Sequence, residues 1–522
     1  MESLSDTKWD AVISGTGLQQ SLLALIFSSR AGLWKSDHQT RALSRSGKEI
    51  LHVDPNGYYG GSEAALTLDE VDEWVKRHAR ANTSGSDDIF NAARVVRENE
   101  TAALSSRSYS IALAPHFVHA KSELISQLVS SKAFRQIEFL AVGSFFVLQQ
   151  SSSATPPPAL ARIPSTREDV FSNTSIPARS KRLLMKFLKF VLDFDSEANQ
   201  EIWKSHAGDL LSQFLVTEFK LDESLQSYVV ALTLSIDGQV LVEEGLRAIH
   251  RHMTSMGIFG AGFAAVYPKW GGLCEIAQVG CRALAVGGAV YMLGTGIKDV
   301  LETPSTDDSG QAKLEIKLDN DLAIRSPRLI QSLNQRAPNS RSVRRLTAVI
   351  DSRLSTLFEA VVDGAPAPAV AVVALPQGSL PSIDGTFTYP VYAMVHSSIT
   401  GECPNGQSII YLSTMADPDA DAALDQSLTA ILTAASESVD GSTSLQILYR
   451  LYYEQAEGPS STSVDGRIVN MPCSSVALAF DDATLQSVRD AWELLREPEA
   501  DDGDYMKFDD REGQDDVDDI YD

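Results

Sequence analysis

Residues 9–20 read WDAVISGTGLQQ, and residues 50–61 read ILHVDPNGYYGG. The first stretch predicts a buried β-strand, a tight turn at Gly15 and Gly17, and a helix; the second predicts a β-strand that ends at the acidic Asp54. This order is typical of the βαβ unit that binds dinucleotides. Such a unit has a third glycine for close helix packing, but Gln20 stands there. The stretch predicts the scaffold and leaves the cofactor open.

The glycine turn alone is a weak signal, since any α/β protein can join a strand to a helix in this way. Residues 56–61 add a less common feature, because two tyrosines stand between glycines directly after the acidic end of the second strand. The βαβ unit predicts an α/β fold whose large domain is Rossmann-type, like FAD- and NAD(P)-binding domains. The apolar helices and the strands further along the chain add a β-sheet and a smaller inserted all-helical domain to this prediction.

The composition restricts the partners. The 522 residues carry a net charge of −25, which disfavours nucleic acid and anionic membrane surfaces as direct partners. The four cysteines lack CxxC spacing, which fits a reducing compartment and indicates no structural zinc and no disulfide framework. The first six residues show no secretory signal, and no stretch approaches the ~18 apolar residues of a membrane-spanning helix.

Three helical stretches in the middle of the chain are unusually apolar: 182–194, 209–219 and 224–236. Helices with so little polar surface must be covered. A helical core explains each apolar residue most simply. The functional alternative is that such helices part to admit a lipid.

A glycine-rich block at 259–272 leads into a predicted helix with Glu275, Gln278 and Arg282 at positions i, i+3 and i+7. This spacing puts an acid, an amide and an arginine on one helix face. Such a face suits recognition of a polar protein surface, although a solvated face has the same pattern. In the preceding helix, His250 and His252 lack neighbours at metal-ligand spacing, so we expect both on the polar surface.

The C-terminal half predicts strands at 348–351, 369–375, 390–396 and 408–414, followed by a helix at 421–436. The last two strands form a predicted hairpin. Residues 325–345 are basic and rich in serine, which indicates a surface insertion. Residues 29–42 lengthen the link between the first helix and the second strand, and we assign them no function.

Together these motifs resemble the family of Rab GDP-dissociation inhibitors and Rab escort proteins, over most of residues 8–495. The resemblance rests on the YYGG turn at 58–61, the segment at 162–171 and the block at 259–293. In that family the first domain has the flavoprotein fold without a working flavin site. The resemblance therefore implies no cofactor and a vestigial dinucleotide turn, made of Gly15, Gly17 and Asp54.

The resemblance also implies two binding sites. The family binds Rab GTPases through a platform whose matching residues here are Tyr59, Glu275, Gln278, Arg282 and Met292. Val290 departs from the family's common threonine, and the turn before Glu275 is one residue longer than usual. The family's small helical domain takes up geranylgeranyl groups, and the candidate residues to line that lipid pocket are Phe187, Phe190, Val191 and Leu232.

Within the family, the length of the chain and the segments 346–351, 364–368 and 448–455 are similar to escort proteins, particularly fungal ones. An escort protein is not an enzyme and has no catalytic residue or metal. It holds GDP-bound Rab GTPases, both unprenylated and geranylgeranylated. It presents them to the α/β heterodimer of Rab geranylgeranyltransferase, shields the geranylgeranyl lipid and makes transient membrane contact. The rival hypotheses are a recycling Rab GDP-dissociation inhibitor and, from another class, a flavin-dependent oxidoreductase, which Gln20 disfavours.

The expected domain organisation is discontinuous. Residues 1–118 and 237–495 form the flavoprotein-like domain with the Rab platform, and residues 119–236 form the mainly helical domain on the lipid and transferase side. Residues 496–522 form an acidic tail that we expect to be disordered. The expected location is the cytoplasm, with transient visits to membranes and the nucleus as a further compartment.

Overall fold

The computed structural model describes residues 4–28, 49–79, 88–98, 104–149, 158–164, 170–171, 176–303, 313–332, 334–360, 364–382, 385–436, 445–473, 475–495 and 505–507. The predicted insertion at 29–42 and nearly all of the predicted tail at 496–522 lie outside these ranges. Within them, no helix has both the length and the apolar character needed to cross a bilayer.

The predicted βαβ unit lies near one edge of a six-stranded sheet. Strand β1 (Ala11–Ser14) pairs in parallel with β2 (Ile50–Asp54), and helix α1 (Leu18–Phe27) follows β1. The full order is β10 (Val290–Leu293), β2, β1, β14 (Leu329–Ser332), β23 (Ile468–Met471) and β22 (Ser463–Asp465), parallel throughout except for β22.

Both faces of this sheet are covered by other elements. Successive side chains of a strand point to opposite faces, so neighbouring residues of β1 show what covers each face. Ala11 and Ile13 face α1, α10 (Leu273–Val286) and α12 (Thr484–Leu495). Val12 faces the opposite side, where an antiparallel three-stranded sheet packs, formed by β11 (Ile297–Thr303), β12 (Lys313–Leu318) and β13 (Ala323–Ser326). The strands are therefore apolar on both sides, as expected for parallel strands.

The prediction of a surface insertion at 325–345 is wrong. Strand β14 lies next to β1 in the middle of the parallel sheet, and its Leu329 and Ile330 have no exposed surface. The second half of the segment begins β15 (Ser342–Ile350), a central strand of the larger sheet. The many arginines and serines in 325–345 suggested an exposed segment. The short apolar pair Leu329 and Ile330 is what places β14 inside the sheet.

The larger sheet has ten strands. Its order is β4 (Phe90–Arg97), β21 (Ile447–Ala456), β15, β20 (Ser408–Met415), β19 (Val391–Ser397), β16 (Val370–Leu375), β7 (Phe139–Gln149), β9 (Phe263–Pro268) and β6 (Val118–His119), with β8 (Ala159–Arg162) paired to β7. The predicted hairpin is confirmed, since β19 and β20 pair antiparallel. Smaller elements are α2 (Leu68–His78), α3 (Glu123–Ser130), the pair β3 (Ala65–Leu66) and β5 (Ile111–Ala112), and the pair β17 (Pro381–Ser382) and β18 (Gly385–Thr386).

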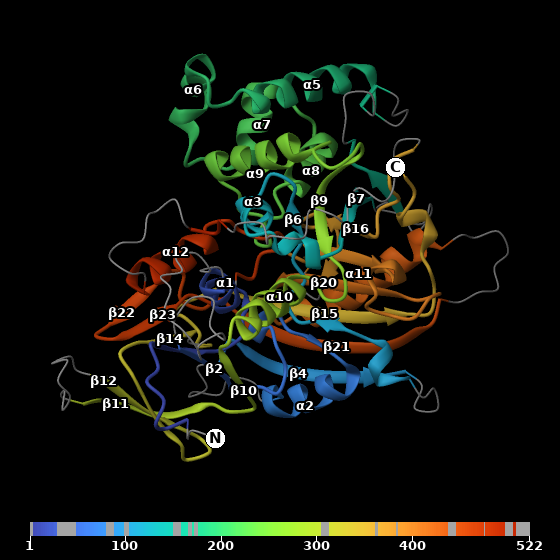
Figure 1. The fold of residues 1–522 in the computed structure, drawn as a ribbon. Helices are drawn as coiled ribbons and strands as arrows, with labels where there is room; N and C mark the ends of the chain where they lie inside the picture. The colour runs from blue at the N-terminus through green and yellow to red at the C-terminus, as the bar shows by residue number, and fades with distance from the viewer. Residues whose placement is uncertain are drawn as a thin grey trace, which may run out of the picture.

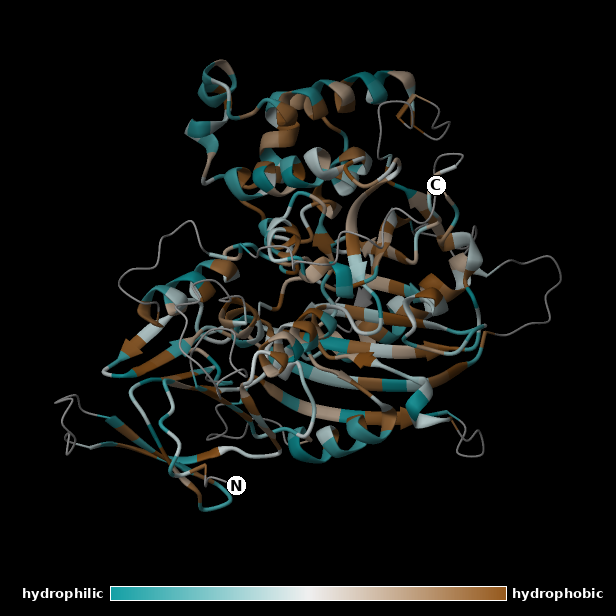
Figure 2. Cartoon of the chain, viewed as in Figure 1, coloured by the Kyte–Doolittle hydropathy of each residue, from teal (hydrophilic) through white to brown (hydrophobic). Residues whose placement is uncertain are grey.

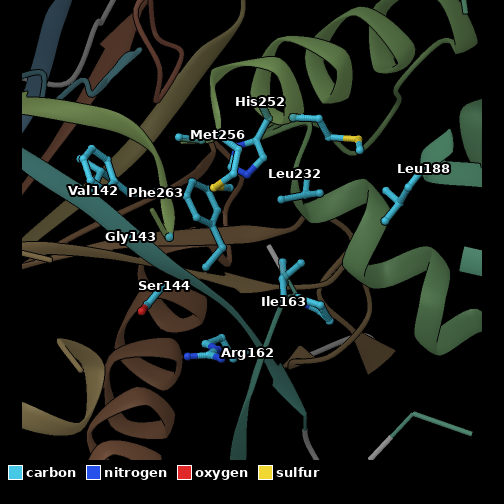
Figure 3. Close-up of a pocket in the computed structure, with 15 residues that line it drawn as sticks. Val142, Gly143, Ser144, Arg162, Ile163, Leu188, Leu232, His252, Met256 and Phe263 are labelled. Atoms are coloured by element: carbon cyan, nitrogen blue, oxygen red, sulfur yellow. The ribbon is translucent and has the colours of Figure 1, made fainter. Parts of the chain in front are cut away.

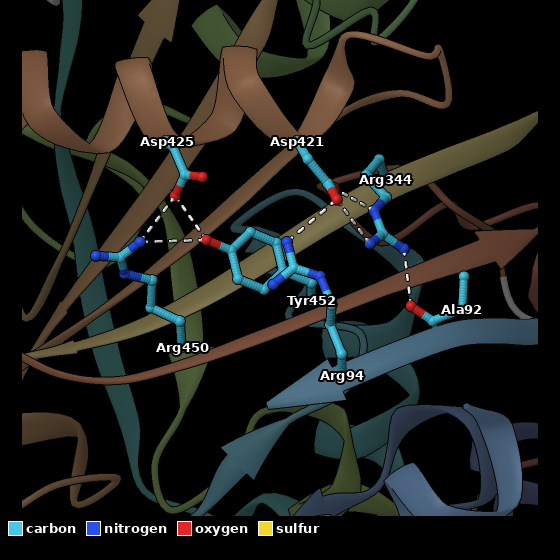
Figure 4. A network of polar contacts seen from close by, with 7 residues as sticks. All are labelled: Ala92, Arg94, Arg344, Asp421, Asp425, Arg450 and Tyr452. Atoms are coloured by element: carbon cyan, nitrogen blue, oxygen red, sulfur yellow. Dashed lines mark hydrogen bonds and ion pairs between the residues drawn. The ribbon is translucent and has the colours of Figure 1, made fainter. Parts of the chain in front are cut away.

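Helix α11 (Ala420–Ala435) covers one face of the larger sheet, and its first turn is anchored by charge (Figure 4). The Asp421 carboxylate accepts hydrogen bonds from Arg344 at 2.6 and 3.2 Å and from Arg94 at 3.2 Å. The Arg94 guanidinium also lies 3.6 Å from the centre of the Tyr452 ring. These contacts join the helix to three adjacent strands.

Among the described residues, five helices form a layer against the β6, β7 and β9 end of the larger sheet, at the top of Figure 1. They are α5 (Ala178–Leu192), α6 (Glu197–Trp203), α7 (Leu211–Phe219), α8 (Glu223–Ala231) and α9 (Val242–Ser255). In Figure 2 these helices carry both hydrophobic and hydrophilic residues.

The bounds of this layer differ from the predicted helical domain at 119–236. Strands β7 and β8 fall inside that range, yet they belong to the larger sheet. Phe145 and Val147 of β7 pack on one face of the sheet and Phe146 and Leu148 on the other, so the apolar run is a strand buried on both sides. Helix α9 begins after residue 236 but packs on α5 and α7.

A short part of the predicted disordered tail is ordered. Met506 is 1% exposed and packs in the core shared by α1 and α12. The ring of Tyr505 lies 5.2 Å from the ring of Trp492 on α12. Tyr505 and Met506 thus pack against the core although the segment around them is acidic. The prediction of disorder rested on the charge of the segment and missed these two apolar residues.

Candidate functional site

The glycine turn after β1 is held by backbone and side-chain contacts. Gly15 has a φ of +95°, which favours glycine, and its N–H donates to the carbonyl of Val53 at 2.8 Å. The N–H and the hydroxyl of Thr16 both donate to Asp54 Oδ2 at 2.7 Å. Burial raises the pKa of the Asp54 carboxyl, and the Thr16 hydrogen bonds oppose that rise. The buried Asp54 carboxyl therefore holds the turn through its two hydrogen bonds with Thr16.

The N-terminus of α1 receives a carboxylate of the chain itself. Glu63 is 3% exposed, and its Oε2 accepts a hydrogen bond from the Leu18 N–H at 3.4 Å. Burial raises the pKa of Glu63 to about 7. A Cβ added to Gly17 would lie 3.0 Å from Gln20 Oε1 and 3.5 Å from Glu63 Oε2. The place where a dinucleotide pyrophosphate would meet the helix thus contains a carboxylate and an amide.

These residues do not fit a dinucleotide cofactor. A pyrophosphate at α1 would meet the Glu63 carboxylate, and Asp54 already accepts two hydrogen bonds from Thr16. The three predicted residues Gly15, Gly17 and Asp54 do line one hollow, together with Gln20 and Glu63. In the described part of the chain, no group of three or more His, Cys, Asp or Glu residues is arranged to hold a metal.

The tyrosine turn packs against the start of α10. Gly60 has a φ of +102°, and a Cβ there would lie 2.8 Å from Cys274 Sγ. The Cys274 thiol donates to the carbonyl of Tyr59 at 3.5 Å. Because only glycine allows this approach, the turn places Tyr59, which is partly exposed, beside the first turn of the helix that carries Glu275.

Helix α10 presents the predicted polar face. Glu275 and Gln278 are partly exposed and Arg282 is exposed. Partial burial raises the pKa of the Glu275 carboxyl, and the positive charge of Arg282 opposes the rise. Gln278 donates weakly to Cys274 Sγ at 3.5 Å. Arg282 forms no hydrogen bond or ion pair with a side chain in the described ranges, so its guanidinium is available to a partner.

The inner face of α10 lies against α1. A Cβ added to Gly280 would be 2.2 Å from the backbone oxygen of Ser21, and the Ser21 hydroxyl lies 3.3 Å from Cys281 Sγ. This contact fixes the distance between the two helices. It therefore also sets how far the polar face of α10 stands from the sheet.

The fifth predicted platform residue, Met292, lies on the neighbouring edge strand. Met292 of β10 is opposite Val53 of β2 and packs, partly buried, toward the three-stranded sheet. The adjacent Tyr291 faces the helices, with its ring 6.5 Å from that of Tyr59. The structure thus joins Tyr59 to α10 and to β10, and it places Met292 on the opposite face of β10 from Tyr291.

A second hollow lies between the helical layer and the larger sheet (Figure 3). Its apolar lining includes Leu188 of α5, Leu232 at the end of α8, Met253 and Met256 at α9, and Phe263 of β9. Of the four predicted lipid-pocket residues, only Leu232 lines it. Phe187 and Val191 are fully buried and Phe190 nearly so, and the Phe187 and Phe190 rings lie 5.1 and 5.0 Å from that of Phe219.

His252 also lines this hollow, so its expected surface position is wrong. It is 5% exposed and its ring lies 4.9 Å from Phe145. Burial lowers the pKa of His252 to about 4. The helix period contained the signal, because His252 follows Leu246 and Ile249 on the buried face of α9. His250 is partly exposed.

Comparison with known proteins identifies the family. A family model described as GDP dissociation inhibitor matches residues 5–429. The chain belongs to the GDP dissociation inhibitor family. It is 31% identical over 444 residues to a protein of Saccharomyces cerevisiae described as Rab proteins geranylgeranyltransferase component A, which covers 83% of this chain and 66% of that protein. The chain thus spans just under two thirds of that relative.

Solved structures confirm the predicted fold class. The crystal structure of a Rab GDI from Plasmodium falciparum superposes with a TM-score of 0.62 at 17% identity, over 94% of this chain and 98% of that one. An oxidoreductase from Methanosarcina mazei superposes with a TM-score of 0.54 at 13% identity, over 93% of this chain and all of that one. At these identities the likeness concerns the fold alone.

Proposed function

We propose that this chain is a Rab escort protein. It binds a Rab GTPase in the GDP form, presents it to the Rab geranylgeranyltransferase heterodimer, and accompanies the prenylated product to a membrane. The family supports GTPase binding, and the similarity to a relative described as component A of the transferase supports the escort role. The chain then contributes binding and no catalytic residue.

The observation that carries the proposal is the outer face of α10. Glu275, Gln278 and Arg282 lie on one helix beside Tyr59, and the Arg282 guanidinium forms no hydrogen bond or ion pair with a described side chain. A planar guanidinium binds carboxylates and carbonyls with two hydrogen bonds at once. A protein surface with acidic and carbonyl groups therefore suits this face.

The second hollow supports the shielding of a lipid. Its aliphatic and thioether side chains come from α5, the end of α8, α9 and β9, which belong to the helical layer and the sheet. Each methylene that leaves water gains about 0.8 kcal/mol, so a long isoprenoid needs a host. We propose that Leu188, Leu232, Met253 and Met256 contact the isoprenoid, since flexible methionines adapt to such a chain.

The test is prenylation of an unprenylated Rab GTPase by purified Rab geranylgeranyltransferase, with this chain added or withheld. We expect the reaction to depend on this chain and to weaken with Arg282→Ala. Arg353→Ala is the matched control, because Arg353 is also exposed but lies beyond the end of β15. No stimulation, together with extraction of prenylated GDP-bound Rab from membranes, would mean a recycling inhibitor instead.

A flavin-dependent oxidoreductase is the alternative that the fold alone allows. The carboxylate of Glu63 at α1 argues against it. Visible absorption of the purified protein checks this point: a flavin band that remains after gel filtration would contradict the proposal.

A further inference from the structure

Trp270 is a large exposed residue two positions before Gly272, the N-cap of α10. Its side chain is 54% exposed, and its backbone φ is +78°. Bulky residues rarely adopt this left-handed conformation, because the Cβ crowds the backbone. Such strain persists only where the surroundings enforce it, and it concentrates at functional positions.

The surroundings of Trp270 enforce this conformation. Its N–H donates to the carbonyl of Thr400 at 2.8 Å, and the Ser110 hydroxyl donates to its carbonyl at 2.8 Å. The ring lies on Gly401, where an added Cβ would be 2.2 Å from the Trp270 ring. The turn at residues 398–401 is thus a shelf on which the indole rests with its other face outward.

A fully buried polar network supports this shelf. The Glu402 carboxylate accepts hydrogen bonds from the Tyr267 hydroxyl at 2.6 Å and from the Thr400 hydroxyl at 3.3 Å, and it lies 2.5 Å from His396 Nδ1. The Tyr267 hydroxyl would be 2.8 Å from a Cβ at Gly272. The same network therefore holds both the shelf and the N-cap of α10.

We propose that Trp270 extends the platform and inserts its indole into an apolar depression of the GTPase that α10 binds. This inference rests on the proposed function. Exposed tryptophans held rigidly beside polar anchors are the residues that most often dominate protein interfaces. Trp270 also precedes Glu275 by only five residues, and the two share one support, so a partner seated on the α10 face is close to the indole.

The local charge favours a protein over a membrane as the occupant. The Lys269 ammonium lies 4.9 Å from the Trp270 ring centre, but it is paired with Glu138 at 2.9 Å. A compensated lysine gives little attraction to anionic lipid, and the net charge of −25 opposes it. A tryptophan beside a neutralised pair suits a protein surface.

The test measures the affinity of the full chain for purified GDP-loaded, unprenylated Rab GTPase by calorimetry. Trp270→Gly relieves the backbone strain, because glycine suits a φ of +78°. We expect binding to weaken at least tenfold with this variant, while the thermal unfolding midpoint stays equal or rises. Trp270→Tyr should restore most of the affinity. Val464→Ala, at a 51% exposed apolar residue of β22, is the control and should bind like the wild type.

The outcomes separate this inference from the proposed function. If the wild-type chain binds the GTPase and Trp270→Gly binds equally well, the inference is wrong and the proposed function stands. The same holds if Trp270→Gly loses only binding to anionic vesicles. If the wild-type chain binds no GTPase while its fold is intact, the proposed function fails and this inference fails with it.

Discussion

The N-terminus of α1 and the outer face of α10 belong to one parallel α/β layer, and both carry charged groups. These groups differ in burial and in hydrogen bonding. At α1, Asp54 and Glu63 are buried and accept hydrogen bonds from Thr16 and Leu18. On α10, Arg282 is exposed and has no described side-chain partner. The polar groups of the first region are paired within the chain, whereas Arg282 in the second region faces solvent.

This difference indicates how a dinucleotide-binding scaffold can serve another role. The glycine turn remains, since it is needed to connect strand and helix, while the carboxylate of Glu63 occupies the anion position. The proposed binding surface lies on a neighbouring helix whose inner face is fixed by the Gly280 contact with Ser21. Four changes would break or sharpen the comparison.

The largest expected effect comes from Gly280→Val, which separates the two helices. A Cβ there would lie 2.2 Å from the Ser21 backbone oxygen, so α10 must move away from α1. We expect a loss of about 3 kcal/mol or more in the free energy of unfolding, measured by urea denaturation. Ala285→Val, on the exposed side of the same helix, should change it by less than about 0.5 kcal/mol. Equal effects would contradict the close packing.

Glu63→Gln should sharpen the contrast by removing the Glu63 charge at the N-terminus of α1. Burial raises the pKa of Glu63 from 4.5 to about 7, so the folded state holds the proton more tightly than the unfolded state. The wild-type stability therefore falls as pH rises from about 4.5 to 7. The variant should be more stable by up to about 3 kcal/mol at pH 8 and by almost nothing at pH 4. Denaturant titrations at both pH values check this, and an equal gain at both would contradict it.

Arg282→Ala should weaken binding at the outer face of α10 and leave the α1 region unchanged. Removal of a central interface arginine costs about 2 kcal/mol of binding free energy, which corresponds to roughly 30-fold in affinity for the GDP-bound GTPase. The unfolding free energy should stay within about 0.5 kcal/mol of the wild type, because Arg282 is exposed. Calorimetry and thermal unfolding of one preparation measure both quantities. A variant that loses stability but keeps affinity would show that Arg282 has a structural role and no binding role.

The smallest effect is expected from Asp421→Asn, far from both regions. The substitution removes the negative charge that Arg344 and Arg94 neutralise. The Asp421 and Arg94 side chains are partly exposed. We expect a loss of about 1 kcal/mol in stability and no change in GTPase affinity. The hydrogen bonds hold the pKa of Asp421 below its usual value, so the loss should shrink as pH falls below about 4. A change in affinity would show that α11 is coupled to the platform.

The sequence predicted those parts of the fold whose pattern is local. The run at 369–375 is β16 because its apolar, β-branched residues suit a strand buried on both faces. The Glu275, Gln278 and Arg282 face was also predictable, since helix spacing alone sets it. Strand β14 was not, because its four residues are defined by β1 and β23, partners about 320 and 140 residues away in the chain.

The candidate sites show the same limit. Apolar character suggested Phe187 and Val191 as pocket residues, but the phase of α5 turns both into the core and leaves Leu188 at the hollow. Polarity suggested a surface position for His252, and the phase of α9 buries it. Glu63 was missed altogether, because nothing in its local sequence indicates that it meets the N-terminus of a helix 45 residues earlier.

The exposure of Trp270 makes the chain its own fluorescent probe. Of the five tryptophans that the structure describes, Trp9, Trp74, Trp203 and Trp492 are each at most 5% exposed, whereas Trp270 is 54% exposed. Buried indoles already emit from an apolar environment, so transfer of one indole out of water changes chiefly the emission of Trp270. With Trp34→Phe to remove the sixth tryptophan, a blue shift on adding a tryptophan-free partner would report docking in real time, without a label on either protein.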